Sequence, residues 1–334
     1  MRRRLINRSS INRSPIDRIS AMTQDVQLFT PSGSTDFVPI TRTPGMPGLF
    51  AKMICLSMVR SSGLCPETEL GGTGLVYRGR RIDPDNLSRF KAVCGYDDEA
   101  GTRDMVPAPY IQTLFIGIIG RFISSSDFPI NPMGLIQVGQ SFELKRPVTP
   151  ETPLDLFCSL LDMNQTPKGI HSRFLLEARD GDTLVWVGIS TYFTRAKNPP
   201  PKEDKDRTEE VPLTVRETIT LPENTGRRYA AVSGDYNPHH LYAWTARFIG
   251  FKRAIAHGMW SLARACASLE TAFGHPEIYR IEGALKLPIF LPGTVTLGFD
   301  TQDARADFEL RDADKGLPHL KGRFISGPAG DDQA

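Results

Sequence analysis

The sequence lacks the features that mark several common protein classes. Its most apolar stretch, residues 111–123, is interrupted by polar side chains and falls short of the roughly 20 residues that span a bilayer. The formal net charge is only +2, with 23% charged residues, so neither nucleic acid nor an anionic membrane is an expected partner. With 40% hydrophobic residues, the composition is instead that of an ordinary globular protein.

Cysteine is scarce and its pattern is uninformative. The chain has five cysteines at wide spacings and no CxxC pair: Cys55, Cys65, Cys94, Cys158 and Cys266. An odd number without paired spacing argues against a disulfide framework or a zinc ribbon. We therefore expect free, mostly buried thiols in a reducing compartment.

The N-terminus has no apolar core of the kind that a secretory signal requires. Residues 1–21 carry six arginines and several serines against one acid, Asp17. This composition is typical of an organellar transit peptide, of a disordered basic tail, or of an upstream stretch if translation starts at Met22. We expect a cytoplasmic protein, with a mitochondrial location as the alternative if the leader is a transit peptide.

The 334 residues suffice for about two domains, and one segment divides them. Residues 196–212 contain three consecutive prolines followed by dense mixed charge, which favours an exposed linker. We predict an irregular segment over 1–45, a first domain over 46–195 and a second domain over 213–328.

The two halves share three sequence blocks in the same order. AVCGY at 92–96 corresponds to AVSGD at 231–235, and an apolar helical pattern follows each. The third pair is LKRPVTPETPLDLF at 144–157 and LKLPIFLPGTVTLGF at 285–299, and β-rich segments lie nearby. We predict an α+β fold in which each half is one long apolar helix wrapped by an antiparallel sheet.

The segment AVSGDYNPHH at 231–240 admits a structural and a chemical interpretation. Structurally, Asn237 can cap a helix whose first position suits Pro238. Chemically, Asp235 and His240 lie five residues apart across a turn, so both side chains can face one water molecule. A neutral imidazole and a carboxylate can then hold and deprotonate that water, while the Asn237 amide fixes backbone or substrate.

A second segment, IAHGM at 255–259, begins the apolar helical pattern of the second half. It places His257 and Gly258 at a helix N-terminus, where a backbone N–H is a ready oxyanion donor. A base, a polarised water and an oxyanion hole together suit the addition of water to a double bond conjugated with a thioester, or its removal.

Two other interpretations of these residues stay open. The side chains of Asp235, His239, His240 and His257 can be counted as metal ligands, although neighbouring histidines on a turn converge poorly and no HExxH or cysteine cluster supports them. We expect no metal, and activity that survives a chelator would dismiss one. A non-catalytic thioester-binding protein is the other alternative, but it would have no physical need for the Asp235 and His240 pair.

The segment resembles the hydratase motif of the MaoC-like dehydratases, the (R)-specific enoyl-CoA hydratases. That motif reads roughly S-G-D-x-N-P-x-H, and it matches Ser233, Gly234, Asp235, Asn237, Pro238 and His240. Downstream, the matching residues are Ala246, Gly250, Phe251, Ile255, Ala256, His257, Gly258 and Met259. His239 departs from the aliphatic residue usual at its position, and the register leaves His240 as the catalytic histidine. The resemblance implies a double hot-dog fold and the reversible hydration of trans-2-enoyl-CoA to (3R)-3-hydroxyacyl-CoA in fatty-acid or acyl-CoA metabolism. Dehydration of a 3-hydroxyacyl group on acyl carrier protein is the alternative.

The first half lacks the chemistry of the second. Cys94, Gly95 and Tyr96 stand in place of Ser-Gly-Asp, and Ala108-Pro109 replaces His-Gly. We expect this half to be inactive, to pair with the catalytic half and to shape the acyl pocket.

The expected substrate is a coenzyme A thioester, with no other cofactor. The candidate residues for substrate and CoA contacts are His257 and three basic residues, Arg228, Lys252 and Arg253, because CoA carries phosphates. The same basic residues would also attract an acyl carrier protein, and a homodimer is a further expectation.

Overall fold

The computed structural model describes residues 35–42, 46–59, 72–96, 104–125, 128–132, 134–200 and 213–328. The predicted irregular N-terminal segment and the predicted linker lie mostly outside these residues, so both stay predictions. In the described part of the chain, no helix is long and apolar enough to cross a membrane.

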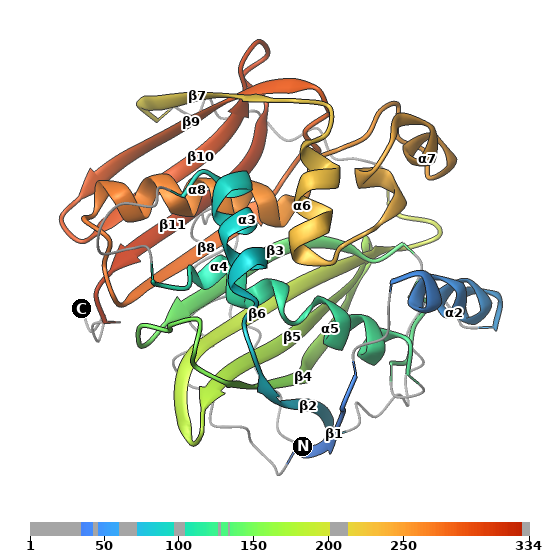
Figure 1. Ribbon diagram of the computed structural model, residues 1–334. Helices are drawn as coiled ribbons and strands as arrows, with labels where there is room; N and C mark the ends of the chain where they lie inside the picture. Colours follow the sequence, from blue (N-terminus) through green and yellow to red (C-terminus); the bar gives the residue numbers. More distant parts are fainter. Residues whose placement is uncertain are drawn as a thin grey trace, which may run out of the picture.

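Eleven strands form one continuous sheet in the order β1-β2-β4-β5-β6-β3-β8-β11-β10-β9-β7 (Figure 1). The strands of the first half are β1 (Asp36–Pro39), β2 (Thr73–Arg80), β3 (Ile136–Leu144), β4 (Leu154–Thr166), β5 (Gly169–Asp180) and β6 (Thr183–Arg195). Those of the second half are β7 (Val215–Leu221), β8 (Tyr279–Leu285), β9 (Gly293–Gln302), β10 (Arg305–Asp312) and β11 (Pro318–Ser326). Each half thus contributes one continuous portion of the sheet.

The two portions meet where β3 pairs with β8 in antiparallel register, with Phe142 opposite Ile281. Apart from the parallel pair β1 and β2, neighbouring strands in the sheet are antiparallel. Four of the antiparallel pairs, β4–β5, β5–β6, β9–β10 and β10–β11, are hairpins with short connections, since antiparallel neighbours need only a tight turn.

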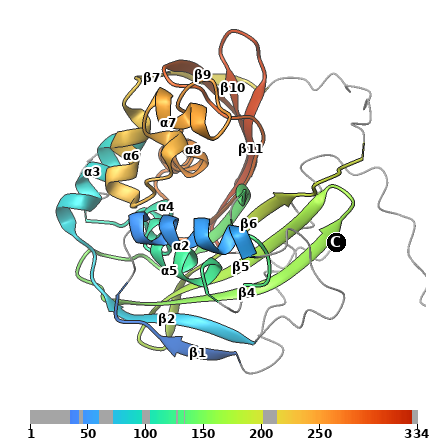
Figure 2. The same cartoon turned by 90° about the vertical axis from the view of Figure 1, so that its right-hand side faces the viewer.

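The helices pack against the concave face of this sheet (Figures 1 and 2). In the first half they are α2 (Met46–Val59), α3 (Pro84–Cys94), α4 (Ala108–Thr113) and α5 (Ile116–Ile123). In the second half they are α6 (Thr225–Ser233), the 3-10 turn η2 (Pro238–His240), α7 (Ala243–Phe248) and α8 (Gly258–Ala272). Helix α8 crosses the strands of the second half, while α4 and α5 cross those of the first (Figure 1).

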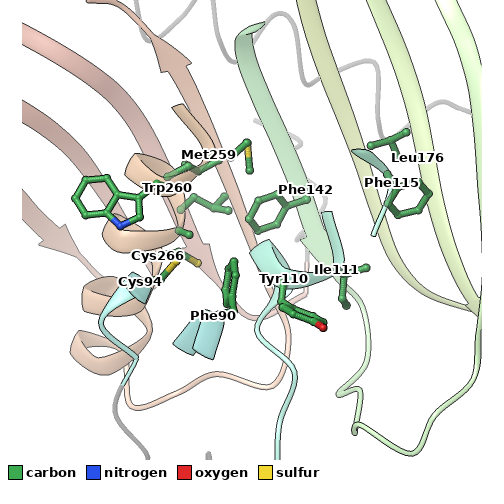
Figure 3. Packing of buried hydrophobic residues seen from close by; sticks show 14 of the residues in the cluster. Phe90, Cys94, Tyr110, Ile111, Phe115, Phe142, Leu176, Met259, Trp260 and Cys266 are labelled. Carbon is green, nitrogen blue, oxygen red and sulfur yellow. The ribbon is translucent and has the colours of Figure 1, made fainter. Parts of the chain in front are cut away.

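One hydrophobic core runs through both halves. Figure 3 shows Met259 and Trp260 of α8 on one side of Phe142 and Phe115 on the other. Phe142 and Phe115 both stack on the fully buried ring of Trp186, and the Trp260 indole N–H donates to the carbonyl of Val93 at 2.9 Å. The halves therefore share buried surface and cannot be separated without exposing large aromatic side chains.

The helix predicted for the first half is interrupted, which corrects the expectation of one long helix in each half. Helix α4 ends before Leu114 and Phe115, whose amides donate to Ile111 and Gln112 three residues back, both at 3.1 Å. These bonds tighten the chain into a 3-10 turn before α5 starts. Helix α8 runs unbroken for 15 residues.

A helix wrapped by an antiparallel sheet occurs in each half, and the two sheets join into one. The structure therefore confirms the predicted α+β double hot-dog fold. The fold also brings the turn that follows α6 next to the start of α8, where Nε2 of His257 lies 2.9 Å from the backbone carbonyl of Asp235.

Candidate active site

The turn after α6 is shaped by a glycine and a proline. Helix α6 ends at Gly234, whose φ of 78° lies in the left-handed region, and its amide donates to the carbonyl of Ala230 at 2.9 Å. Glycine reaches this conformation without steric cost. Pro238 then opens the 3-10 turn η2, which ends at His240. The chain thus reverses sharply between Asp235 and His240, as the structural interpretation of the segment requires.

The carboxylate of Asp235 is oriented by Asn237. One carboxylate oxygen, Oδ1, accepts a hydrogen bond from the Asn237 side-chain amide at 2.9 Å and from its backbone amide at 3.2 Å. Asn237 occupies the N-cap position of η2, but its side chain makes no capping bond. Its side-chain amide binds the Asp235 carboxylate instead. Oδ1 is therefore held by Asn237, and Oδ2 is left for a different partner.

The imidazole of His240 is buried and held in one tautomer. Its Nδ1 lies 2.8 Å from the carbonyl oxygen of Ile255, and a carbonyl only accepts hydrogen bonds. Nδ1 therefore carries the proton and Nε2 is left as the basic nitrogen. Burial lowers the pKa of His240 well below its usual value, with smaller contributions in the same direction from His257 and His239. His240 is consequently a neutral base at physiological pH.

The side chain of His257 packs against the imidazole of His240. Its side chain is 2% exposed, and its Nε2 lies 2.9 Å from the backbone carbonyl of Asp235 and 3.9 Å from the carboxylate oxygen Oδ2. Its ring stacks on that of His240 with 3.6 Å between centroids. Burial lowers the pKa of His257 to about 3, so this ring too is neutral and ties Asp235 to His240.

Gly258 is the first residue of α8, with His257 at the N-cap. The amides in the first turn of a helix have no intrahelical acceptor, and the helix dipole places partial positive charge at this end. A Cβ at position 258 would lie 2.4 Å from Leu285 Cδ1, so this glycine allows α8 and β8 to approach closely. The site therefore combines a neutral imidazole, an oriented carboxylate and the backbone amides of a helix N-terminus, and their catalytic roles stay a prediction.

The structure adds residues that the sequence interpretation missed. A Cβ at Gly226 of α6 would lie 2.0 Å from the carbonyl oxygen of His240, so a glycine is needed for α6 to pack against the turn η2. The first half also reaches the site: Gln137 Nε2 lies 3.6 Å from the sulfur of Met259, next to Gly258. A glycine within a helix, such as Gly226, signals a close approach of another segment. Nothing in the sequence alone signals the contact between Gln137 and Met259.

Gln140 is the centre of a hydrogen-bonded group of polar side chains from the first half. Its side-chain oxygen accepts hydrogen bonds from Gln137 Nε2 at 3.0 Å and from Ser190 Oγ at 2.6 Å. Gln140 and Ser190 are buried, so this network holds Gln137 in place beside Met259. The expectation that the first half shapes an acyl pocket stays a prediction.

The basic candidates are exposed. Arg228 lies on α6, and Lys252 and Arg253 lie between α7 and α8. The guanidinium of Arg253 lies 5.6 Å from the centroid of the Phe290 ring and 3.4 Å from the carbonyl oxygen of Pro292. Position and exposure are compatible with phosphate contacts, which stay a prediction.

The geometry of the three ionisable side chains fits a metal ion poorly. Asp235, His240 and His257 each offer one atom within 4.8 Å of the others. However, the rings of His240 and His257 stack with only 23° between their planes. Nearly parallel rings do not direct their lone pairs at one central point, as tetrahedral coordination requires.

Comparison with known sequences gives a family match and a curated relative. Residues 198–301 match the MaoC-like domain family. The chain is 28% identical over 244 residues to the 3-hydroxyacyl-thioester dehydratase X of Mycobacterium tuberculosis, covering 72% of this chain and 84% of that protein.

The fold is also found in solved structures. The crystal structure of HtdX from M. tuberculosis superposes with a TM-score of 0.65 at 24% identity, covering 76% of this chain and all of that one. A MaoC-like dehydratase from Phytophthora capsici gives a TM-score of 0.62 at 19% identity, covering 77% of this chain and 96% of the other. These likenesses show a shared fold.

Proposed function

We propose that the protein is a hydro-lyase acting on acyl thioesters, because residues 198–301 match the MaoC-like domain family and the chain is similar to a 3-hydroxyacyl-thioester dehydratase. The specific reaction proposed is the reversible hydration of trans-2-enoyl-CoA to (3R)-3-hydroxyacyl-CoA. The observation that carries this proposal is the pairing of a tautomer-fixed, neutral His240 with an oriented Asp235 beside the N-terminus of α8.

The proposed chemistry follows from the atoms that are left free. Nε2 of His240 and Oδ2 of Asp235 hold one water molecule, and the thioester carbonyl accepts a hydrogen bond from the Gly258 amide. The water oxygen forms a bond to Cβ while its proton passes to His240 Nε2, and the double-bond electrons move towards the carbonyl. The same pair of residues supplies a proton to Cα. In reverse, the hydroxyl leaves as water and the double bond forms again.

The size of each contribution can be anticipated. A positioned general base is worth about 10² to 10⁴ in rate, and one oxyanion donor is worth about 10² to 10³. Asn237 serves by orienting Asp235, and His257 serves the substrate site by holding the backbone of Asp235 beneath the reacting atoms. Arg228, Lys252 and Arg253 are the residues proposed to meet the phosphates of CoA.

The direct test uses the purified wild-type protein. Crotonyl-CoA should lose its enoyl absorbance, the product should be the (3R) alcohol, and a series of longer enoyl-CoA substrates should define the acyl length. The activity should survive a chelator, because no step requires a metal. Binding of crotonyl-CoA without turnover would instead indicate a thioester-binding protein, and a (3S) product would contradict the proposed facial selectivity.

A second candidate substrate has the same acyl group on an acyl carrier protein. The reacting atoms and the roles of Asp235 and His240 would be unchanged, since both carriers end in the same thioester arm. The exposed apolar and basic surface around helix α7 favours this candidate.

A further inference from the structure

Helix α7 and the residues around it expose an unusual group of apolar side chains. Phe248 is 85% exposed, Trp244 62%, and Tyr242 and Ile249 44% each. These four residues, together with the exposed Arg247, are called the α7 patch. Large exposed apolar side chains that cluster in this way, bordered by charge, are typical of interaction sites.

The α7 patch is attached to the catalytic turn. Thr245 of α7 donates its hydroxyl to the carbonyl of Pro238 at 2.6 Å. After α7, the ring of Phe251 packs against His239, and the amide of Ile255 donates to the carbonyl of His239 at 3.0 Å. The patch therefore has a fixed position beside His240, and Figures 1 and 2 show α7 at the periphery of the molecule.

The segment that carries the patch is rich in positive charge. Between residues 225 and 258 the chain carries five basic residues, Arg227, Arg228, Arg247, Lys252 and Arg253, and a single acid, Asp235. That acid is bound to Asn237 within the site. Among the described residues, no carboxylate forms an ion pair with Arg247 or Lys252. The surface thus presents uncompensated positive charge next to exposed aromatic rings.

We propose that the α7 patch docks an acidic carrier protein that presents the acyl thioester to Asp235 and His240. The inference rests on the proposed function, because a carrier matters only if the site acts on thioesters. Acidic side chains of the partner would meet Arg247 and Lys252, and its apolar side chains would cover Trp244 and Phe248. Aromatic residues and arginine are the side chains that contribute most at protein interfaces.

The other occupants fit this surface less well. A second copy of the chain would bring positive charge against positive charge. A lipid surface would suit the aromatic and basic composition, but α7 has only six residues, too few for the long amphipathic face of an interfacial helix. A carrier protein also accounts for the position of the patch, since its thioester arm must start close to the catalytic turn.

The test compares two substrates that differ only in the carrier. A crotonyl group is presented either on an acidic acyl carrier protein or on free pantetheine, which has no docking surface. In Arg247→Glu, and in a variant combining Trp244→Ser with Phe248→Ser, kcat/KM for the carrier-bound substrate should fall about tenfold or more, through KM. For crotonyl-pantetheine, kcat/KM should stay within about twofold of wild type.

Matched controls come from exposed residues outside the patch. Val215 is 56% exposed on β7, and Arg305 is exposed on β10. Val215→Ser and Arg305→Glu make the same chemical changes elsewhere and should leave both substrates unaffected. Added salt should weaken turnover of the carrier-bound substrate in the wild type and have little effect in Arg247→Glu.

Each alternative outcome is distinct. Equal losses on both substrates would show that the patch only supports the site, and unchanged kinetics on the carrier-bound substrate would mean that nothing docks there; either result overturns the proposal. Binding to anionic vesicles that depends on Trp244 and Arg247, with unchanged carrier kinetics, would assign the patch to a membrane. If the wild type hydrates none of the thioesters, the proposed function itself is wrong.

Discussion

Helices α3 and α6 both end at a glycine with a left-handed backbone, Gly95 with φ 74° and Gly234 with φ 78°. The next residue is Tyr96 in the first half and Asp235 in the second. The two halves therefore build the same turn and place different chemistry after it. In the second half the turn is followed by His240 and by the N-terminus of α8. In the first half it is followed by the N-terminus of α4, where other side chains of the protein occupy the corresponding space.

The corresponding space in the first half is occupied by the protein's own side chains. The amide of Ala108, which starts α4, donates to the Tyr279 hydroxyl at 3.3 Å, and that hydroxyl donates to Glu270 at 2.6 Å. Tyr96 and Cys266 donate to the same carboxylate oxygen, both at 3.2 Å. Burial raises the pKa of Glu270. Three side chains from the second half, Tyr279, Cys266 and Glu270, thus occupy the place where a substrate would otherwise bind.

The helices that precede the shared turn, α3 and α6, also differ in the size of one side chain. Aligning AVCGY with AVSGD places Leu87 of α3 opposite Gly226 of α6. Leu87 is buried in the core, whereas Gly226 leaves room for the carbonyl of His240. The comparison teaches that the shared helices and turn provide the fold, while an acid, a base and the space for a catalytic turn are what the second half adds.

The largest expected effect comes from exchanging the residue after the shared glycine. Asp235→Asn removes the charge that holds the water and should lower kcat/KM for crotonyl-CoA by about 10³-fold. Its counterpart Tyr96→Phe removes one hydroxyl from a network without substrate and should leave kcat within about twofold. Steady-state hydration assays on both variants measure the contrast. Similar losses in the two would mean that the first half takes part in catalysis.

A smaller effect is expected where the helices differ in bulk. Gly226→Ala places a Cβ against the His240 carbonyl and should lower kcat about tenfold or more, because the turn must shift. Leu87→Ala leaves a cavity in the core instead and should cost about 2–5 kcal/mol of unfolding free energy. Activity per folded molecule should then be retained. Denaturant titration alongside kinetics separates the two effects, and a fully active Gly226→Ala would show that the turn tolerates displacement.

The filled site should contribute stability rather than activity. Tyr279→Phe removes the acceptor of the Ala108 amide and the shortest of the three hydrogen bonds to Glu270, at a cost of about 1–3 kcal/mol in unfolding free energy. Hydration of crotonyl-CoA should change little, since no step involves these groups. Tyr77→Phe, on a tyrosine outside this network, is the matched control. A variant as stable as wild type would show that the network does not hold the halves together.

The smallest effect concerns pH. Burial depresses the pKa of His240, so the basic form persists to more acidic pH than in a free histidine. We therefore expect kcat/KM to vary by less than about twofold between pH 8 and about 6.5, the ordinary histidine pKa, and to fall only below it. The residues that fill the first site titrate differently, because burial raises the pKa of Tyr96 and Tyr279. An acidic limb centred above pH 6.5 would contradict a buried, neutral base.

Much of this arrangement follows from the local sequence. Gly234 and Pro238 determine a turn by their backbone preferences alone, and the turn determines how Asp235 and His240 face each other. The apolar spacing after Gly258 is enough to predict α8. The same spacing in the first half overlooks the break at Leu114, because periodicity reports which face is buried and not whether the backbone hydrogen bonds stay regular.

The remaining features depend on contacts between distant segments. Gln137 reaches Met259 only because β3 pairs with β8, and no local pattern encodes that neighbour. Asn237 was expected to cap a helix, a sound local inference, but the nearby Asp235 carboxylate is its partner. The burial of His257 and its stacking on His240 likewise arise from the packing of α8 against the turn.

The most direct test of the site compares its two adjacent histidines. His240 has Nδ1 fixed by Ile255, whereas the His239 ring packs beside it at 4.0 Å between centroids and is less buried. Hydration of crotonyl-CoA should fall about 10³-fold in His240→Ala and by less than about tenfold in His239→Ala, with both variants folded by circular dichroism. Full activity in folded His240→Ala, or the larger loss in His239→Ala, would contradict the assignment of the base.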